Sequence, residues 1–206
     1  DGSTDKSAEI LDQYARQENR VKVLHQKNGG YGAAMNAGLA AAGGEYVGIV
    51  ESDDCILPQM YETLYEEADL GKLDVVKSDA FFWYERIGYQ KQIHAAHLEP
   101  YYDRVLDSMD RNIFFDFYMN IWTGIYKREF LAREGIRFHE SPGASYQDNG
   151  FWLQTMLYCK KAKWLGQAFY LYRQDNEDSS VKSRDKVLAM TREYEYIEKL
   201  LLERRD

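Results

Sequence analysis

The feature that most constrains the fold of this chain is a short apolar run that ends in clustered carboxylates. Residues 46–50 are followed at once by Glu51-Ser52-Asp53-Asp54, and Leu57-Pro58 comes soon after. In open α/β folds, ligands bind at the carboxyl edge of the sheet, where such a turn would lie. Carboxylate oxygens there suit a divalent cation such as Mg²⁺ or Mn²⁺, which in turn binds a diphosphate. The turn therefore predicts an α/β fold with a cation and diphosphate site.

The first 85 residues alternate between helix and strand patterns. Capping residues and glycines mark the helix ends, and short apolar runs mark the strands. Alternation with short links implies a mostly parallel, Rossmann-like sheet with helices on both faces. The expected elements are a helix capped at 3–5 that runs through Tyr14, a strand at 21–25, a helix at 33–42 after the glycine-rich loop 28–32, a strand at 45–50, a helix at 58–71 and a strand at 74–82.

The rest of the chain is less regular. Residues 86–120 predict a loop-rich region that faces an acceptor, and amphipathic spacing predicts a C-terminal helix over 187–205. Further helices are expected at 127–134 and 148–161, with a strand at 164–173. No repeat or linker divides the chain, so we expect one domain. Its expected parts are a nucleotide-sugar half at 1–85, an acceptor half at 86–182 and the C-terminal helix at 183–206.

Composition narrows the class of protein. A net charge of −8 over 206 residues argues against a nucleic-acid partner. No run is long and apolar enough to span a bilayer, and no signal peptide is visible. Cys55 and Cys159 lack metal-ligand spacing, which favours a reduced, cytoplasmic protein. Seventeen Tyr and four Trp suit a sugar pocket, although filling the core is the favoured interpretation.

Three motifs follow one another in order and at a consistent spacing. They are Asp-Gly-Ser-Thr-Asp at 1–5, Asn-Gly-Gly-Tyr-Gly-Ala-Ala-Met-Asn-Ala-Gly-Leu at 28–39, and Gly-Glu-Tyr-Val-Gly-Ile-Val-Glu-Ser-Asp-Asp at 44–54. Together they resemble the nucleotide-binding half of the family 2 inverting glycosyltransferases, which have the GT-A fold. The resemblance is close over 1–85 and looser as far as Tyr172-Arg173. The opening motif is typical of a loop after a strand, so we expect that the native strand upstream is missing.

The resemblance implies a hexosyl transfer from a nucleotide-diphosphate sugar, with a UDP-sugar as the expected donor. The expected acceptor is a hydroxyl of a glycan or of a polyprenyl-lipid-linked sugar in bacterial polysaccharide biosynthesis. Asp53 and Asp54 would ligate Mn²⁺ or Mg²⁺, although Asp54 also suits a cap for the helix that follows. The expected nucleotide-sugar contacts are Asp1 near the base and ribose, Lys27, Asn28 and Gly29 in the loop, Glu51, Ser52 and Asp53 in the turn, and Arg173 over the diphosphate.

The same resemblance implies a catalytic base. Asp148 matches the aspartate that deprotonates the acceptor, and Gln147 replaces the glutamate that usually precedes it. An N-capping role for Asp148 is the structural alternative, and the two roles are compatible. Trp122 and Thr123, with the aromatic run 114–118, are expected to form either an acceptor wall or ordinary core.

Two further expectations concern other chemistry and partners. His94 and His97 stand three residues apart without a third ligand nearby, so we do not expect a metal site there. A lipid-linked acceptor would place the enzyme at the cytoplasmic face of the membrane. The C-terminal helix with Arg204 and Arg205 would contact that membrane or, as the favoured alternative, pack on the domain. The sequence does not indicate an oligomeric state.

Two other classes of protein remain open on the sequence. One is a non-catalytic module that binds a nucleotide sugar or a glycan, which the Gln147 replacement and the incomplete start favour. The other is a nucleotidyltransferase that makes the nucleotide sugar. Such an enzyme would carry a basic, glycine-rich motif for a triphosphate near its N-terminus, and no such motif is visible.

Overall fold

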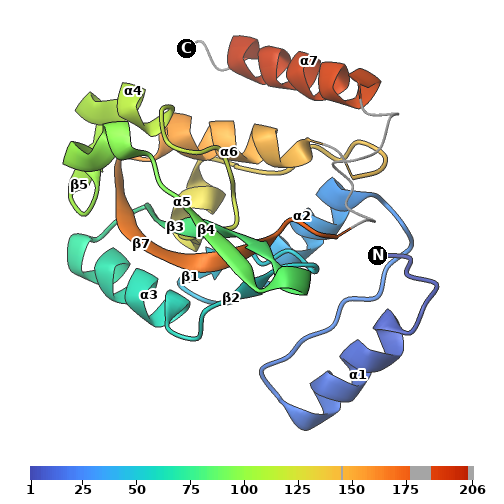
Figure 1. The fold of residues 1–206 in the computed structure, drawn as a ribbon. Helices are drawn as coiled ribbons and strands as arrows, with labels where there is room; N and C mark the ends of the chain where they lie inside the picture. The colour runs from blue at the N-terminus through green and yellow to red at the C-terminus, as the bar shows by residue number, and fades with distance from the viewer. Residues whose placement is uncertain (145, 177–186, 204–206) are drawn as a thin grey trace. The chain divides into compact units, whose positions relative to one another are not determined.

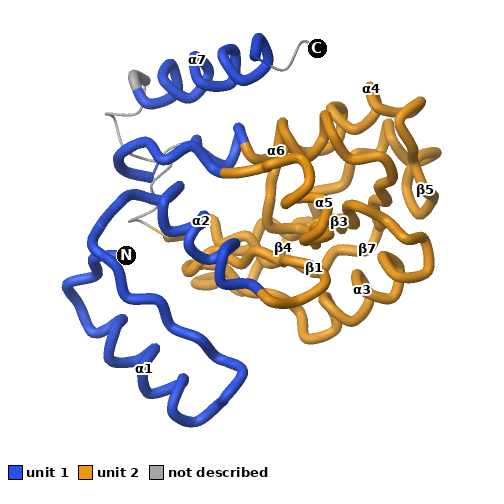
Figure 2. The backbone as a smooth tube through the Cα atoms, turned by 180° about the vertical axis from the view of Figure 1, so that it is seen from behind, with its two compact units in different colours: residues 1–42, 138–150, 185–206 blue, residues 43–137, 151–184 orange. Residues whose placement is uncertain are grey.

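The computed structural model describes residues 1–144, 146–176 and 187–203. The chain divides into two compact units, each built from separate stretches of sequence (Figure 2). The first unit draws on 1–42, 138–150 and 185–206, and the second on 43–137 and 151–184. These boundaries differ from those of the expected halves, so the assignment of one domain with parts at 1–85, 86–182 and 183–206 stays a prediction.

A seven-stranded sheet forms the centre of the second unit (Figure 1). Its strand order is β1-β6-β3-β7-β2, with β4 paired to β3 and β5 paired to β7. Among the described strands, β3 and β7 pair in parallel and the other pairs are antiparallel. The strands are β1 (Tyr46–Gly48), β2 (Cys55–Ile56), β3 (Val75–Tyr84), β4 (Tyr89–Ile93), β5 (Val105–Asp107), β6 (Gly124–Lys127) and β7 (Lys161–Arg173).

The predicted α/β class is confirmed, whereas the prediction of a mostly parallel sheet is wrong. β1, β3 and β7 do run in one direction, as alternating helices and strands require. However, β6 inserts between β1 and β3 and is antiparallel to both. A strand from residues 124–127 therefore separates two strands that the local pattern would have placed side by side. Alternation along the chain predicts strand direction, but it does not predict which strands become neighbours.

Helices cover this sheet, with α3 (Met60–Gly71) and α6 (Gln147–Tyr158) on opposite sides in Figure 1. The first six residues of β3 are all buried, as a central strand requires. Apolar side chains of α3, β3 and α6 are buried. Residues with no exposed surface include Met60, Leu64, Ala68, Val75, Val76, Phe151 and Met156. Short elements complete this unit: η1 (Glu85–Ile87), η2 (Ala96–Tyr101), η3 (Ser108–Asp110), α4 (Arg111–Phe114) and α5 (Arg128–Arg133).

The first unit contains α1 (Ser7–Gln17), α2 (Tyr31–Ala41) and α7 (Val187–Glu203). Buried Asn36 of α2 holds residues 138–140, which form no helix or strand. Its amide donates to the Phe138 carbonyl at 3.0 Å and to Glu140 at 2.8 Å, and its oxygen accepts from the Phe138 N–H at 2.9 Å. These bonds pack α2 closely against residues 138–140 at Asn36. At Gly38, by contrast, an added Cβ would meet nothing within 4 Å.

Polar contacts tie α7 into the first unit. Glu193, whose side chain is 1% exposed, accepts from His139 Nδ1 at 3.0 Å and from the Ser141 hydroxyl. The Tyr196 ring stacks on His139 with centroids 4.0 Å apart. Tyr194 and Leu201, which belong to the predicted apolar face, are exposed instead. Arg204 and Arg205 lie outside the described residues, and no helix in the described ranges is long and apolar enough to cross a membrane.

Most predicted helices and strands are confirmed, with changes at their ends. The predicted strand at 21–25 is wrong, because these residues form no ladder with a neighbouring strand. A strand is stable only when a partner satisfies its backbone, and Val21 and Leu24 stay exposed here. The loop-rich prediction for 86–120 is only partly right, since β4, β5 and the short helices η2, η3 and α4 form there.

Candidate active site

The carboxylate turn lies between β1 and β2, and one tyrosine of β7 holds it in place. The Tyr170 hydroxyl accepts from the Glu51 N–H at 3.1 Å and donates to Asp54 Oδ2 at 2.8 Å. The backbone N–H of Arg173 donates to Asp54 Oδ1 at 2.9 Å. Both oxygens of Asp54 are thus bound to β7, which anchors the whole turn to the edge of the sheet.

Burial shapes the electrostatics of this anchor. It raises the pKa of the Asp54 carboxyl, while the hydrogen bonds from Arg173 and Tyr170 act in the opposite direction. Burial also raises the pKa of the Tyr170 hydroxyl, so this hydroxyl stays a hydrogen-bond donor at neutral pH. Asp54 is therefore a structural carboxylate in this geometry, and its expected role as a metal ligand remains a prediction.

Asp53 is held more loosely than its neighbour. It is half-buried, and its Oδ2 accepts from the Asn176 side-chain amide at 2.9 Å. Ser52 beside it is exposed. Within the described ranges, no group of three His, Cys, Asp or Glu side chains is arranged to hold a metal ion. The turn thus offers carboxylate oxygens near the surface without a complete protein cage.

Arg173 supports the turn through its backbone and makes other contacts through its side chain. Its guanidinium lies over the Trp83 ring, 5.0 Å from the centroid, and pairs with Glu85 at 2.9 Å. Its Nε is buried and has no hydrogen-bond partner among the described residues. A diphosphate contact for Arg173 remains a prediction.

One of the two predicted acceptor residues, Trp122, lies against the same tyrosine. The Trp122 ring stacks on Tyr170 with centroids 4.4 Å apart and lies 5.0 Å from Tyr172. Thr123 is 1% exposed, and both its N–H and its hydroxyl donate to Asn120 Oδ1. Both residues are buried, which agrees with the expected alternative that they belong to the ordinary core. Their contact with an acceptor remains a prediction.

The glycine-rich loop forms around Asp1 in the first unit. Asp1 accepts from the Gly29 N–H at 2.9 Å and from the Gly30 N–H at 3.1 Å. Lys27, Asn28 and Gly29 are exposed, as nucleotide contacts would require. Gly30 has φ +88°, and a Cβ there would lie 2.8 Å from the Ser141 carbonyl oxygen, so this position needs glycine.

Asp148 lies in the first turn of α6, one residue after the helix begins. Gln147 before it is 1% exposed and donates through its amide to the Ser141 hydroxyl at 2.9 Å. The positive end of the helix dipole favours a carboxylate at this position. The helix begins at Gln147, which places Asp148 inside the helix rather than at the N-cap. The replacement of glutamate by Gln147 therefore supplies a neutral donor that braces the preceding loop.

Sequence reasoning missed the residues that hold the turn, Tyr170 and Asn176. Tyr170 sits within a strand that was predicted, but its position in the strand does not reveal that its hydroxyl reaches residues 51–54. The predicted site residues accordingly fall into two groups. The turn, Arg173, Trp122 and Thr123 belong to the second unit, while Asp1, residues 27–29 and Asp148 belong to the first.

Comparison with known proteins identifies the family. Residues 1–131 match the family described as Glycosyl transferase family 2, and the chain belongs to it. The uncharacterized glycosyltransferase YibD of Escherichia coli is 33% identical over 98% of this chain and 59% of its own length. The uncharacterized glycosyltransferase EpsJ of Bacillus subtilis is 31% identical over 85% of this chain and 51% of its own length. The chain thus spans between half and three fifths of these two relatives.

The fold is that of the GT-A glycosyltransferases. The structure of Staphylococcus aureus TarS 1–349 in complex with UDP-GlcNAc matches 88% of this chain and 50% of its own, with a TM-score of 0.68 and 21% identity. The same protein in complex with UDP matches with a TM-score of 0.63. At this identity the match defines the fold and not the ligand of the present chain.

Proposed function

We propose that this chain is the catalytic part of an inverting hexosyltransferase that uses a UDP-sugar. The acceptor is a hydroxyl of a glycan or of a lipid-linked sugar, and the product belongs to a polysaccharide. Membership of Glycosyl transferase family 2 supports this proposal, as does the likeness in fold to a protein solved with UDP-GlcNAc. The Gln147 replacement favours the non-catalytic alternative, whereas the nucleotidyltransferase alternative has no specific observation in its favour.

The observation that carries the proposal is the anchored carboxylate turn. Because Tyr170 and Arg173 bind both oxygens of Asp54, the adjacent Asp53 is presented at the edge of the sheet. A fixed turn can bind a diphosphate through a cation without reorganising first. In this proposal the two neighbouring aspartates have different main roles, in which Asp54 positions the turn and Asp53 is the principal ligand of the cation.

The donor atoms of this turn fit Mn²⁺ or Mg²⁺. Both are hard cations that prefer oxygen ligands, and Mg²⁺ is typically held by one or two carboxylates together with phosphate oxygens and water. Asp53 would be the principal ligand, and Asp54 would contribute a remaining lone pair. The bound cation would supply Lewis-acid neutralisation of the charge that grows on the diphosphate.

The protein's own contribution to the reaction centres on Asp148. Inversion needs one displacement, so the acceptor oxygen attacks the anomeric carbon opposite the leaving diphosphate and no covalent intermediate forms. The Asp148 carboxylate removes the proton of the acceptor hydroxyl during that attack. Asp1 and the exposed residues 27–29 bind the nucleoside, and Glu51 and Ser52 lie on the ribose side of the turn.

The test is calorimetric binding of UDP, GDP and dTDP with and without Mn²⁺. We expect Mn²⁺-dependent binding of UDP that is lost in Asp53→Asn and kept in Glu62→Gln, an exposed carboxylate on α3. Unchanged binding in Asp53→Asn would overturn the assigned role of the turn. If none of the three nucleotides binds, the proposed donor class is wrong.

A further inference from the structure

A cavity lies in the second unit, and residues 51–54 of the carboxylate turn are not among the residues that line it. The cavity has a volume of about 230 Å³ and is lined by parts of β3, β4, η2 and the segment 116–123. That is room for about seven waters, and it is slightly below the usual range for ligand pockets, so it suits one ring-sized group. Neither the base nor the metal-binding carboxylates line this cavity.

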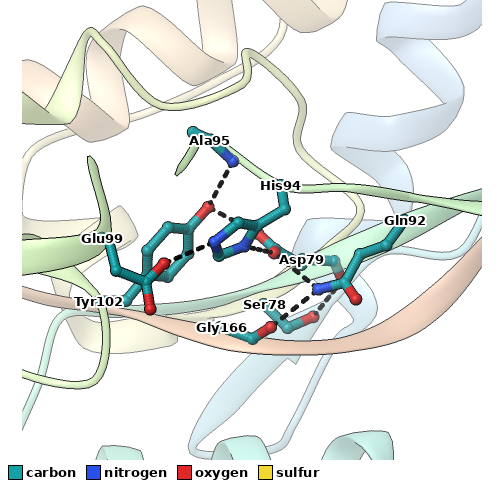
Figure 3. Close-up of polar contacts among 8 residues, drawn as sticks. All are labelled: Ser78, Asp79, Gln92, His94, Ala95, Glu99, Tyr102 and Gly166. Carbon is teal, nitrogen blue, oxygen red and sulfur yellow. Dashed lines mark hydrogen bonds and ion pairs between the residues drawn. The ribbon is translucent and has the colours of Figure 1, made fainter. Parts of the chain in front are cut away.

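A β-bulge directs a carboxylate to this cavity. The pairing of β3 with β7 shifts register on both sides of Asp79, so that extra residues of β7 stand opposite it. Bulges are uncommon between parallel strands, and near functional sites they re-aim a side chain. Here Asp79 accepts from the Tyr102 hydroxyl at 2.8 Å and from the Gln92 amide at 3.0 Å (Figure 3). Gln92 also donates to the Gly166 carbonyl at the bulge, at 2.9 Å.

A histidine bridge holds the wall of the cavity. His94 Nδ1 bonds to Asp79, and its Nε2 bonds to Glu99 of η2 at 2.7 Å (Figure 3). A histidine that donates to a carboxylate through each ring nitrogen is the protonated form. The His94 ring also stacks on Tyr102 with centroids 4.6 Å apart. The polar wall is therefore built before any ligand arrives.

The buried lysine of the cavity, Lys77, donates its hydrogen bonds to other groups of the protein. Lys77 has no exposed surface and donates to the Asn120 carbonyl at 2.6 Å and to Asn120 Oδ1 at 2.9 Å. A third contact joins it to the Tyr126 hydroxyl at 3.4 Å. Burial lowers the pKa of the Lys77 amine to about 7, which weakens it further as an anchor for an anion. Lys77 and His94 thus donate to groups of the protein. Neither side chain directs a donor to a bound phosphate.

The remaining lining suits a neutral, polyhydroxylated ring. Phe117 and Trp164 are buried and stacked, with centroids 4.4 Å apart, and give the cavity an aromatic wall. Asp116 is exposed, and in the described part of the chain its side chain has no hydrogen bond or ion pair. A carboxylate at the open side accepts from hydroxyls and repels phosphate. Aromatic walls with a few polar groups are typical of sites that bind and orient small ligands.

We propose that this cavity binds one uncharged sugar residue of the acceptor, with Asp116 accepting from its hydroxyls and Phe117 and Trp164 forming the apolar wall. This inference rests on the proposed function and specifies its acceptor as a neutral glycan rather than one that bears a phosphate at this residue. Thr123, expected from the sequence to contact the acceptor, also lines the cavity.

The test is saturation-transfer NMR with the methyl glycosides of glucose, galactose and N-acetylglucosamine, with glucose 6-phosphate as the anionic probe. We expect binding of at least one neutral glycoside in preference to the phosphate. Asp116→Asn should weaken it about tenfold, as the loss of a hydrogen bond to a charged group does. Ala95→Leu, which places a larger side chain in the lining, should abolish it. Glu66→Gln on the exposed side of α3 is the matched control and should have no effect.

The outcomes separate this inference from the proposed function. If UDP binds and none of the glycosides does, or if glucose 6-phosphate binds more tightly, the cavity proposal is wrong while the transferase proposal stands. If glycoside binding is the same in Asp116→Asn and Ala95→Leu as in the unmodified chain, the sugar binds elsewhere and the proposal fails. Glycoside binding at the cavity without UDP binding would support this inference and overturn the proposed donor.

Discussion

The carboxylate turn and the histidine bridge use the same device in two different settings. In each, a tyrosine hydroxyl donates at 2.8 Å to a carboxylate, Tyr170 to Asp54 and Tyr102 to Asp79. In the turn, the anchored aspartate has a second aspartate beside it in sequence, Asp53, which accepts from Asn176 and is the proposed ligand of the cation. In the bridge, Asp79 forms hydrogen bonds with Gln92, His94 and Tyr102. Its carboxylate therefore serves to hold the wall of the cavity.

The difference shows that the same residue type serves chemistry or architecture according to how many donors surround it. Asp79 is 7% exposed and has three side-chain donors. Asp53 is half-buried and has a hydrogen bond from Asn176. A buried carboxylate without hydrogen-bond donors would destabilise the folded protein. The donors around Asp79 are therefore needed for the stability of the fold. Four predictions test this contrast.

The largest effect is expected at Asp148, the proposed base. Asp148→Asn keeps the size of the side chain but cannot accept a proton from the acceptor. The transfer rate should fall by about 10²–10⁴-fold, measured as UDP release from a UDP-sugar with acceptor present. The affinity for UDP should be unchanged by calorimetry. A rate within threefold, roughly, of the unmodified enzyme would mean that another group is the base.

The second effect concerns stability and should appear only at the bridge. Asp79→Ala leaves His94, Tyr102 and Gln92 without their shared acceptor. The free energy of unfolding in urea should fall by about 3 kcal/mol, as for other buried pairs that lose one partner. Asp53→Ala, as the comparison variant, should cost less than about 1 kcal/mol. Equal losses at the two positions would remove the distinction between the two carboxylates.

The third effect compares the two tyrosines directly. Tyr170→Phe and Tyr102→Phe each remove one hydroxyl donor from a carboxylate and should each cost about 1–2 kcal/mol in urea unfolding. Only Tyr170→Phe should also weaken Mn²⁺-dependent UDP binding, because only Tyr170 positions the turn. If Tyr102→Phe weakens UDP binding to the same extent, the two sites are not independent.

The smallest effect is a dependence on pH at His94. Its hydrogen bonds to Asp79 and then to Glu99 raise the pKa of His94 above the ordinary value of 6.5. A raised pKa in the folded state stabilises the protein fully below the unfolded value, and this contribution is lost as the pH rises through the folded value. Glu99→Gln should bring the pKa of His94 closer to its ordinary value in an NMR titration. Glu66→Gln is the control, and the same His94 titration in both variants would contradict the bridge.

Local patterns predicted most helices and strands of the fold. The helix at 58–71 and the strand at 164–173 follow from apolar periodicity and from Pro58 and Gly71 at the ends of the helix. The failures share a cause. The strand expected at 21–25 has a suitable pattern but no partner to pair with, and the sheet is not mostly parallel because β6 pairs antiparallel with both β1 and β3. Pairing is a property of two segments, and a single window of sequence contains only one of them.

The candidate site divides in the same way. Glu51 to Asp54 and Asp148 were found because neighbours in sequence, and motifs at fixed spacing, mark them. No motif or neighbour in the sequence points to Tyr170, to Asn120 or to the bridge between Asp79 and Glu99. His94 was visible as one of two histidines three residues apart. Its actual partners, on β3 and η2, could not be inferred from that spacing.

By itself, the sequence determined the family, the GT-A fold and the carboxylates at the carboxyl end of β1, because these follow from motifs whose residues lie within a few positions of one another. The tertiary structure alone decided which aspartate is anchored, which lysine is buried and where a ring-sized cavity opens. The physical reason is that burial and hydrogen-bond saturation arise only when segments such as β3 and β7, nearly ninety residues apart, come into register.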